Sequence, residues 1–385
     1  MAVIKTKTVP KIRFHEFNDE WQEKTVGELG RFIGGGTPSK KIKKYWSGQI
    51  PWVSSSDIPE NDIGHISYTR FITHEAVSNS ATKIIPVNSV LVVSRVGVGK
   101  LAVNNRIVCT SQDFTNIIPG SVNTIFLAYL LKRNKSKLLG FNQGTSIKGF
   151  TTNNLAILKV YVPSENEQQK IAAFLTAVDD KCNLLQQKID LLKKYKKGLL
   201  QQIFSQKLRF KDDNGKEYPE WEEKKFSNCL ESLSIRPYKI QIAEIKDYGK
   251  YPVVDQGQKE IAGYSDLKTK IFKNIPVIVF GDHTTFLKYI DYEFIIGADG
   301  TKLLKSKDDN SRYLYYYLEF NKIKPEGYKR HFSILKKIRL QIPSKEEQAK
   351  IANLFRNIDS KINLEESKLE QVKNFKSSLL QQMLI

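Results

Sequence analysis

The sequence predicts an α+β protein with a pseudo-twofold internal repeat, in which two mixed α/β domains alternate with two long helices. Residues 162–204 return as residues 342–384, always 180 positions later, and 18 of these 43 aligned pairs are identical. Such a repeat is a stronger guide to architecture than any local motif. We expect a first domain with a short lead at 1–161, a helix at 162–206, a second domain at 207–341 and a second helix at 342–385.

Both repeated segments carry apolar residues at alternating steps of four and three, a pattern typical of a coiled coil. The first seam consists of Ile171, Leu175, Val178, Cys182, Leu185, Ile189, Leu192, Leu199 and Ile203. The second consists of Ile351, Phe355, Ile358, Ile362, Leu369, Val372, Leu379 and Met383. Three charged residues interrupt these seams, namely Lys196, Glu365 and Lys376.

Both helix starts are marked in the sequence. A Pro-Ser pair precedes each helix, which predicts that Ser164 and Ser344 are N-caps, with Glu167 and Glu347 completing a capping box. At 1.5 Å per residue, each helix would be roughly 55 to 60 Å long.

The two domains read as mixed α and β structure. In the first, we expect strands at 50–54, 87–94 and 107–110 and a helix at 124–132. In the second, we expect strands at 251–254 and 275–280 and a helix at 312–320. The short lead segments before the two domains also repeat one pattern, because Arg13-Phe14 before Trp21 matches Arg209-Phe210 before Trp221. The domains between these flanks resemble each other much less, so one scaffold carries two different inserts.

The composition favours a polyanionic partner. The chain has 61 Lys and Arg against 41 Asp and Glu, a net charge of +20, which suits a nucleic acid or an anionic membrane surface. The membrane alternative is weaker, because no apolar run approaches the roughly 18 residues of a spanning helix and the start lacks the apolar core of a signal peptide. Three widely spaced cysteines, Cys109, Cys182 and Cys229, predict reduced thiols in a cytoplasm.

The sequence lacks the usual marks of an enzyme. The segment 94–101 resembles a phosphate-binding loop, but it has Ser94 where that motif needs Gly and Leu101 where it needs Ser or Thr. There is no Asn-Pro-Pro-aromatic or Asp-Pro-Pro-aromatic tetrapeptide of an amino-methyltransferase, and the five His show no metal-ligand spacing. We therefore expect a non-catalytic chain with no metal or cofactor of its own.

Basic and polar residues in the loops are suited to double-stranded DNA, where cations neutralise phosphates and amide or hydroxyl groups contact base edges. In the first domain the candidates are Thr37, Ser39, Lys40, Lys41, Lys43, Lys44, Arg95, Lys100, Thr145, Ser146 and Lys148. In the second they are Gln256, Gln258, His283, Thr284, Lys302, Tyr328, Lys329, Arg330 and His331. Trp52 is expected in the core.

The chain resembles the specificity subunit of type I restriction-modification systems. The resemblance rests on both helix starts of the form Pro-Ser-x-x-Glu-Gln-x-Lys-Ile-Ala, both Leu-Leu-Gln-Gln ends, and the segments 35–39, 50–54, 251–253 and 281–284. It implies two target recognition domains, each reading one half of a split, asymmetric DNA target. It also implies an antiparallel coiled coil that holds the readers apart, about one DNA turn or ~34 Å by the geometry of paired half-sites.

The resemblance further implies partners. Two methyltransferase subunits and the motor-endonuclease subunits would join the chain in a cytoplasmic complex, and they would hold the S-adenosylmethionine, ATP and Mg. We expect Lys196, Glu365 and Lys376 to set the antiparallel register or to face a partner's helices. Two alternatives differ in class: a coiled-coil scaffold that binds RNA or the ribosome, and an enzyme with an active site around Asp282-His283 or Asp299.

Overall fold

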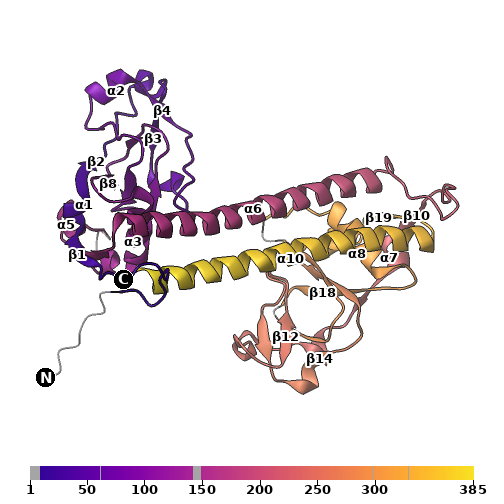
Figure 1. The fold of residues 1–385 in the computed structure, drawn as a ribbon. Coiled ribbons are helices and arrows are strands. Elements are labelled where there is room, and N and C mark those ends of the chain that lie inside the picture. The colour runs from indigo at the N-terminus through magenta and orange to yellow at the C-terminus, as the bar shows by residue number, and fades with distance from the viewer. Residues whose placement is uncertain (1–8, 61, 142–148, 298, 328) are drawn as a thin grey trace. The chain divides into compact units, whose positions relative to one another are not determined.

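The computed structural model describes residues 9–60, 62–141, 149–297, 299–327 and 329–385. Its contacts divide the chain into two compact units. The first unit comprises residues 1–186 and 367–385, and the second comprises residues 187–366. Each unit therefore contains one α/β domain together with segments of both long helices (Figure 1).

The two long helices are α6 (Glu165–Phe204) and α10 (Lys345–Met383), and both lie within the ranges expected for them. Their segments are antiparallel in each unit. In the first unit Asp179 of α6 forms an ion pair with Lys376 of α10. In the second, Lys188 pairs with Glu365 and Lys196 pairs with Asp359, so residue numbers rise along one helix as they fall along the other. This confirms the predicted fold class.

The apolar seam of both helices is largely buried, as expected. In the first unit, Leu175 of α6 and Leu379 of α10 belong to the same core as the domain. In the second unit, Ile203 of α6 and Phe355 of α10 do so. A fully buried side chain of this size stabilises the fold by about 1.5 to 3 kcal/mol. Cys182, a member of this seam, is only partly buried.

The described residues of the first unit's domain form three sheets. Its strands are β1 (Gln22–Thr25), β2 (Gly30–Gly34), β3 (Ile50–Val53), β4 (Phe71–Ile72), β5 (Val90–Val93), β6 (Leu101–Val103), β7 (Cys109–Thr110), β8 (Phe114–Pro119) and β9 (Lys159–Val162). Its helices are α1 (Val26–Leu29), α2 (His74–Ser78), α3 (Thr124–Arg133), α4 (Lys135–Gly140) and α5 (Thr152–Ala156). The strand orders are β2-β8-β5-β6, β4-β3-β7 and β1-β9.

In the second unit, the part of the domain that the structure describes also forms three sheets. Its strands are β10 (Glu222–Lys225), β11 (Leu230–Leu233), β12 (Tyr251–Val254), β13 (Gly263–Ser265), β14 (Ile271–Phe272), β15 (Val277–Gly281), β16 (Leu287–Ile290), β17 (Phe294–Ile296), β18 (Thr301–Ser306) and β19 (Arg339–Ile342). Its helices are α7 (Phe226–Cys229), α8 (Ser311–Phe320) and α9 (Phe332–Leu335). The strand orders are β11-β18-β15-β16, β13-β12-β17-β14 and β10-β19.

The two domains share one topology although their sequences have diverged. The four-stranded antiparallel sheet of the first unit has its counterpart in the second, with β2, β8, β5 and β6 matching β11, β18, β15 and β16. In the other large sheet, the parallel pair β3 and β7 matches the parallel pair β12 and β17. The expected strands at 50–54, 251–254 and 275–280 and both expected helices are present. The duplication therefore extends through the inserts.

The start of each long helix is attached to its domain by a repeated Glu-Gln pair. In the first unit the Gln168 side chain accepts a hydrogen bond from the Asn123 backbone at 2.9 Å and donates one to the Pro163 carbonyl at 2.9 Å. Gln348 makes the matching bonds to Asn310 and Pro343 in the second unit. Because Asn123 and Asn310 are the N-caps of α3 and α8, each glutamine joins two helix starts.

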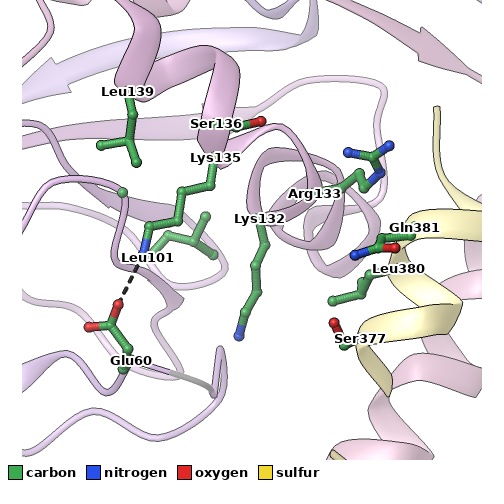
Figure 2. Close-up of a pocket in the computed structure, with 11 residues that line it drawn as sticks. Glu60, Leu101, Lys132, Arg133, Lys135, Ser136, Leu139, Ser377, Leu380 and Gln381 are labelled. Carbon is green, nitrogen blue, oxygen red and sulfur yellow. Dashed lines mark hydrogen bonds and ion pairs between the residues drawn. The ribbon is translucent and has the colours of Figure 1, made fainter. Parts of the chain in front are cut away.

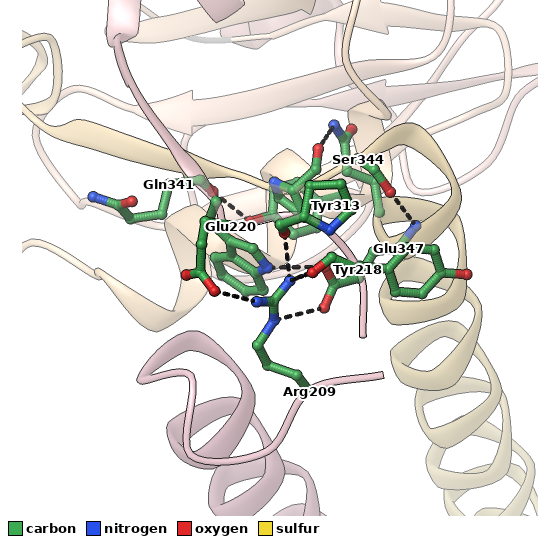
Figure 3. A network of polar contacts seen from close by, with 11 residues as sticks. Arg209, Tyr218, Glu220, Tyr313, Gln341, Ser344 and Glu347 are labelled. Atoms are coloured by element: carbon green, nitrogen blue, oxygen red, sulfur yellow. Dashed lines mark hydrogen bonds and ion pairs between the residues drawn. The ribbon is translucent and has the colours of Figure 1, made fainter. Parts of the chain in front are cut away.

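At the start of α10 the serine half of the predicted capping box is correct, and the glutamate half is wrong. Ser344 does cap α10, since its hydroxyl accepts a bond from the Glu347 backbone at 3.3 Å. The Glu347 carboxylate, however, turns away from the cap and accepts bonds from Arg209 Nη2 at 2.9 Å and Trp221 Nε1 at 3.0 Å (Figure 3). A buried carboxylate gains more from a guanidinium than from a single backbone N–H. The local capping signal therefore loses to a long-range ion pair.

In the first unit the Glu167 carboxylate has partners of the same kinds. Glu167 accepts a bidentate pair of bonds from Arg13, with distances of 2.8 and 2.7 Å, and a third bond from Trp21 Nε1 at 3.3 Å. The Glu167 side chain is 1% exposed and that of Glu347 is wholly buried. The hydrogen bond to glutamate raises the pKa of Arg13, and Glu347 does the same for Arg209. The Arg and Trp that are repeated before the two domains therefore form the same kind of buried network with a helix-start glutamate in each unit. We call this network the anchor.

Candidate nucleic-acid interface

A basic loop follows β2 in the first unit. Ser39, Lys40 and Lys41 are exposed there, and Lys43 and Lys44 begin the short 3-10 helix η1 (Lys43–Trp46). Lys44 forms an ion pair of 2.5 Å with Glu75, whose hydrogen bond raises the pKa of Lys44. Lys44 is therefore partly neutralised, whereas Lys41 has no ion pair among the described residues.

This loop borders a shallow cavity of 330 Å³ lined by Lys40, Lys43, Trp46 and Arg70. The guanidinium of Arg70 lies 4.8 Å from the ring centroid of Trp52, and Arg70 also bonds to Ser54. Trp52 itself is 4% exposed, which confirms its predicted place in the core. Sequence reasoning missed Arg70, because only the pairing of β3 with β4 brings it beside the lysines.

The remaining first-unit candidates are spread over other loops. Arg95 is exposed in the loop after β5. Lys100 is partly buried, with its Nζ 3.7 Å from Glu60, so it is less available to a phosphate. The hydroxyl of Thr37 donates to Gln112. Thr145, Ser146 and Lys148 lie outside the described residues.

Three second-unit candidates lie together where β12 and β15 end. The Gln256 side chain accepts a bond from the His283 backbone at 3.2 Å and donates one to the Asp299 carbonyl at 2.6 Å. The Thr284 hydroxyl donates to the Gln256 carbonyl. Gly300 is required beside them, because its φ is +86° and a Cβ there would lie 2.8 Å from the His283 ring. The result is a preorganised polar surface.

A buried lysine supports this surface. Lys288 Nζ donates to the Asp255 carbonyl at 2.8 Å, and burial lowers the pKa of Lys288. Lys302 is partly buried and lies 3.9 Å from Asp282. Gln258 is exposed at the rim.

The loop before α9 gives a mixed result. Lys329 and Arg330 are exposed, and Lys329 pairs with Glu326 at 2.8 Å. His331 is completely buried, and its Nε2 accepts a bond from the Glu326 backbone while its Nδ1 lies 3.0 Å from the Asp282 carbonyl. The prediction that the His331 ring contacts DNA is therefore wrong, because both ring nitrogens hold the loop. Tyr328 lies outside the described residues.

The same two loops meet in both units. In the first unit the Phe150 backbone donates to the Ser94 carbonyl at 3.0 Å, and in the second the His331 backbone donates to the Asp282 carbonyl at 2.8 Å. Ser94 and Asp282 follow the equivalent strands β5 and β15. One framework therefore presents Arg95 in the first unit and His283 in the second.

The three charged residues in the helical seam are not partner-facing. Lys196 is 12% exposed and lies between Asp359 at 2.8 Å and Glu319 at 3.0 Å. Lys376 is buried against Asp179, and Glu365 is buried and bonded by Lys188 at 2.9 Å. Each of the three forms an ion pair with a residue of its own unit. Of the two predicted roles, the register role agrees with this placement and the partner-facing role does not.

The helices instead expose apolar residues at repeat-related positions. Leu184 of α6 is 63% exposed, and Leu364 of α10, 180 positions later, is 54% exposed. Tyr195 of α6 and Phe375 of α10, also 180 positions apart, are 56% and 52% exposed. Each unit thus contains one member of the leucine pair and one member of the aromatic pair, on opposite helices. The seam-based prediction missed them because they lie off the seam.

The fold and its loops define a class of protein with an internal duplication. Each of its two α/β domains packs on two antiparallel helix segments, and the polar and basic loops of the two domains differ. The chain belongs to the family of the type I restriction modification DNA specificity domain, whose model matches residues 18–194 and 218–374. This confirms the family resemblance of the sequence.

Two relatives and one solved structure illustrate the likeness. The specificity subunit of the type I restriction enzyme MjaIX from Methanocaldococcus jannaschii is 30% identical over 283 residues, which cover 67% of this chain and 65% of the relative. The EcoR124I/EcoR124II specificity subunit from Escherichia coli is 32% identical over 180 residues, 45% of this chain and 44% of the relative. The alignments therefore span less than two thirds of these two relatives.

Among solved structures, the S subunit of a type I restriction-modification system from M. genitalium superposes with a TM-score of 0.66. The superposition covers 98% of this chain and 99% of the other, at 15% sequence identity. This likeness supports the fold. Within the described part of the chain, no helix combines the length and apolar character needed to cross a bilayer.

Proposed function

We propose that this chain is the DNA-recognition subunit of a type I restriction-modification complex and that each unit reads one half of a split, asymmetric target. The observation that carries this proposal is one duplicated framework with different loops at the ends of equivalent strands. Side chains with different donors and acceptors at one place select different bases. The net charge of +20 supports attraction to a DNA backbone. Membership of a DNA specificity family favours this function over an RNA-binding scaffold.

A domain exchange tests the proposal. Residues 207–341 would be replaced by the corresponding segment of a relative with another target, and the methylated sequences would be mapped in cells that carry the partner subunits. We expect one half of the target to change and the other half to stay, because each unit has its own loops. The reciprocal exchange of residues 1–161 is the matched control and should change only the other half. A change of both halves in either chimaera would refute independent readers.

We further propose that two methyltransferase subunits dock on the repeat-related apolar residues of α6 and α10. Two equivalent sites suit two copies of one partner, as in other assemblies with internal symmetry. In this proposal the partners, joined by motor-endonuclease subunits, hold the S-adenosylmethionine, ATP and Mg, and this chain carries out no chemistry. The exposed Leu184 and Leu364, rather than Lys196, Glu365 and Lys376, are the residues that we assign to docking.

Charge substitution at these leucines tests the docking sites. Leu184→Glu and Leu364→Glu should each reduce the number of bound methyltransferase subunits from two to one, and the double variant should bind none. The masses of the complexes, measured by native mass spectrometry, give the stoichiometry. Ile157→Glu and Ile242→Glu are matched controls, because these isoleucines are 53% and 75% exposed on the domains. Full assembly of the double leucine variant would remove these residues from the interface.

A further inference from the structure

A cavity of 460 Å³ in the first unit is lined by a partly buried lysine, Lys132, whose buried ammonium nitrogen has no hydrogen-bond partner among the described residues. Its lining includes Lys132, Arg133 and Lys135 from the end of α3 and the start of α4, and Ser377, Leu380 and Gln381 from α10. In Figure 2 the Lys132 side chain extends into the cavity between the Glu60 and Lys135 pair and the residues of α10. Lys132 Nζ and Arg133 Nε are both buried, and neither has a hydrogen-bond partner among the described residues.

The carboxylates around Lys132 are already engaged. Asp179 forms an ion pair with Lys376 and accepts a hydrogen bond from Tyr129 at 2.8 Å. Asp62 binds His65 and the Gly64 backbone. Glu60 pairs with Lys135 at 2.9 Å. None of these bonds reaches Lys132, although Lys132, Asp62, Asp179 and Lys376 all line an adjoining cavity of 320 Å³.

The second unit shows what is missing. The helices α3 and α8 align from their caps, Asn123 and Asn310, to Asn134 and Asn321, whose side chains both bond to a backbone carbonyl four residues earlier. In this alignment Lys132 is equivalent to Glu319. Glu319 binds Lys196, with oxygens 3.0 and 3.1 Å from its Nζ, and Lys196 is the repeat equivalent of Lys376. The first unit therefore has a lysine where the second has a carboxylate.

An unpaired buried charge is costly, and a lysine beside a second lysine more so. We propose that the cavity beside Lys132 binds an oxyanion of the phosphate class, which replaces the charge that Glu319 supplies in the second unit. The Lys132 ammonium and Arg133 guanidinium provide charge-assisted bonds, and the side chains of Ser136, Ser377 and Gln381 can add neutral donors. The cavity adjoins the loop after β5, because Gly99, next to Lys100, also lines it.

The protonation of Lys132 agrees with this site. Burial, together with the nearby Lys376, lowers the pKa of Lys132 to about 8. A bound anion stabilises the charged ammonium and so raises this pKa. Phosphate should therefore bind more tightly at pH 7 than at pH 9, where the free lysine is mostly neutral.

Thermal unfolding of the full chain tests the site, with inorganic phosphate as the probe and sodium chloride at matched ionic strength as the reference. Phosphate should raise the Tm saturably, because it binds the folded state. Lys132→Met should abolish this phosphate-specific rise. Lys132→Glu should also abolish it and should raise the Tm in phosphate-free buffer above that of Lys132→Met, since it restores the charge pattern of the second unit. Calorimetric titration with phosphate provides an independent affinity.

Lys137→Gln is the matched control, because Lys137 is exposed on α4 and does not line the cavity. It should keep the full response to phosphate. An equal rise in chloride, or a response that survives in Lys132→Met, would overturn the proposal. Dimethyl phosphate carries one charge, like a nucleic-acid backbone, and should bind at least tenfold more weakly than inorganic phosphate. Equal binding would contradict a site selective for free phosphate over a phosphodiester. Failure of Lys132→Glu to fold leaves Lys132→Met as the deciding variant.

Discussion

In the second unit Lys196 lies between two carboxylates, Asp359 and Glu319, whereas in the first unit its equivalent Lys376 faces Asp179 on one side and Lys132 on the other. Both units keep the tyrosine that donates to the aspartate, Tyr316 at 2.7 Å and Tyr129 at 2.8 Å. The bonds that fasten a helix to its domain are thus retained in both copies. Lys132, which lines the neighbouring cavity, instead has the opposite charge to its equivalent in the second unit, Glu319.

The largest expected effect concerns the anchor that the two units share. Glu167→Ala and Glu347→Ala each leave a mostly buried arginine without its counter-charge, so each should lower the free energy of unfolding by about 3 to 5 kcal/mol. Urea titration of each full-chain variant measures this loss. Equal losses would support equivalent anchors. A loss below about 1 kcal/mol in only one of them would show that the two networks are not equivalent.

The next effect should differ between the units. Lys196→Met leaves two carboxylates without their cation and should cost about 2 kcal/mol. Lys376→Met leaves Asp179, which keeps its bond to Tyr129, and it also removes the repulsion with Lys132, so it should cost less. The difference in denaturant midpoint at constant slope gives the comparison. A larger loss for Lys376→Met would contradict the charge assignment.

A smaller effect is expected in the pH dependence of stability. Lys132 has a folded pKa of about 8, below its ordinary value of 10.5, so the unfolded chain holds more protons between these values. Stability should therefore rise from pH 8 to pH 10.5 relative to Lys132→Met. The groups that face Lys132 are Asp62, Asp179, Lys376 and Lys135. Parallel pH profiles of the two proteins in phosphate-free buffer would argue against the lowered pKa.

The smallest effect concerns the basic loops. Lys41 has no ion pair in the described structure, whereas Lys329 is paired with Glu326. Lys41→Ala should flatten the salt dependence of DNA binding by about one unit of slope, and Lys329→Ala should do so less. Binding is measured by fluorescence anisotropy between low and high salt, with the exposed Lys216→Ala as control. An unchanged slope for Lys41→Ala would remove that loop from the interface.

Much of the fold follows from the sequence, because the repeat and the apolar seam are local signals that long helices retain. The contacts of the candidate site were harder to predict from the sequence. Glu167 and Glu347 look like capping residues when only neighbouring positions are considered, but their partners Arg13 and Arg209 are 154 and 138 positions away. The repeated Arg and Trp of the leads were the available signal. No sequence pattern distinguishes the buried His331 from the exposed Arg330, since only the folded loop determines which one turns inward.

The division of the helices between the units has a consequence for synthesis on the ribosome. The second unit is one continuous stretch, residues 187–366, but the first needs residues 367–385 as well. Leu379, Met383 and Leu384 are buried in the first unit, and the Ile12 backbone donates to the Gln382 carbonyl at 3.0 Å. The domain made first must therefore wait for residues 367–385 to emerge before its core is complete. Deletion of residues 367–385 would damage the domain of the first unit and spare the core of the second.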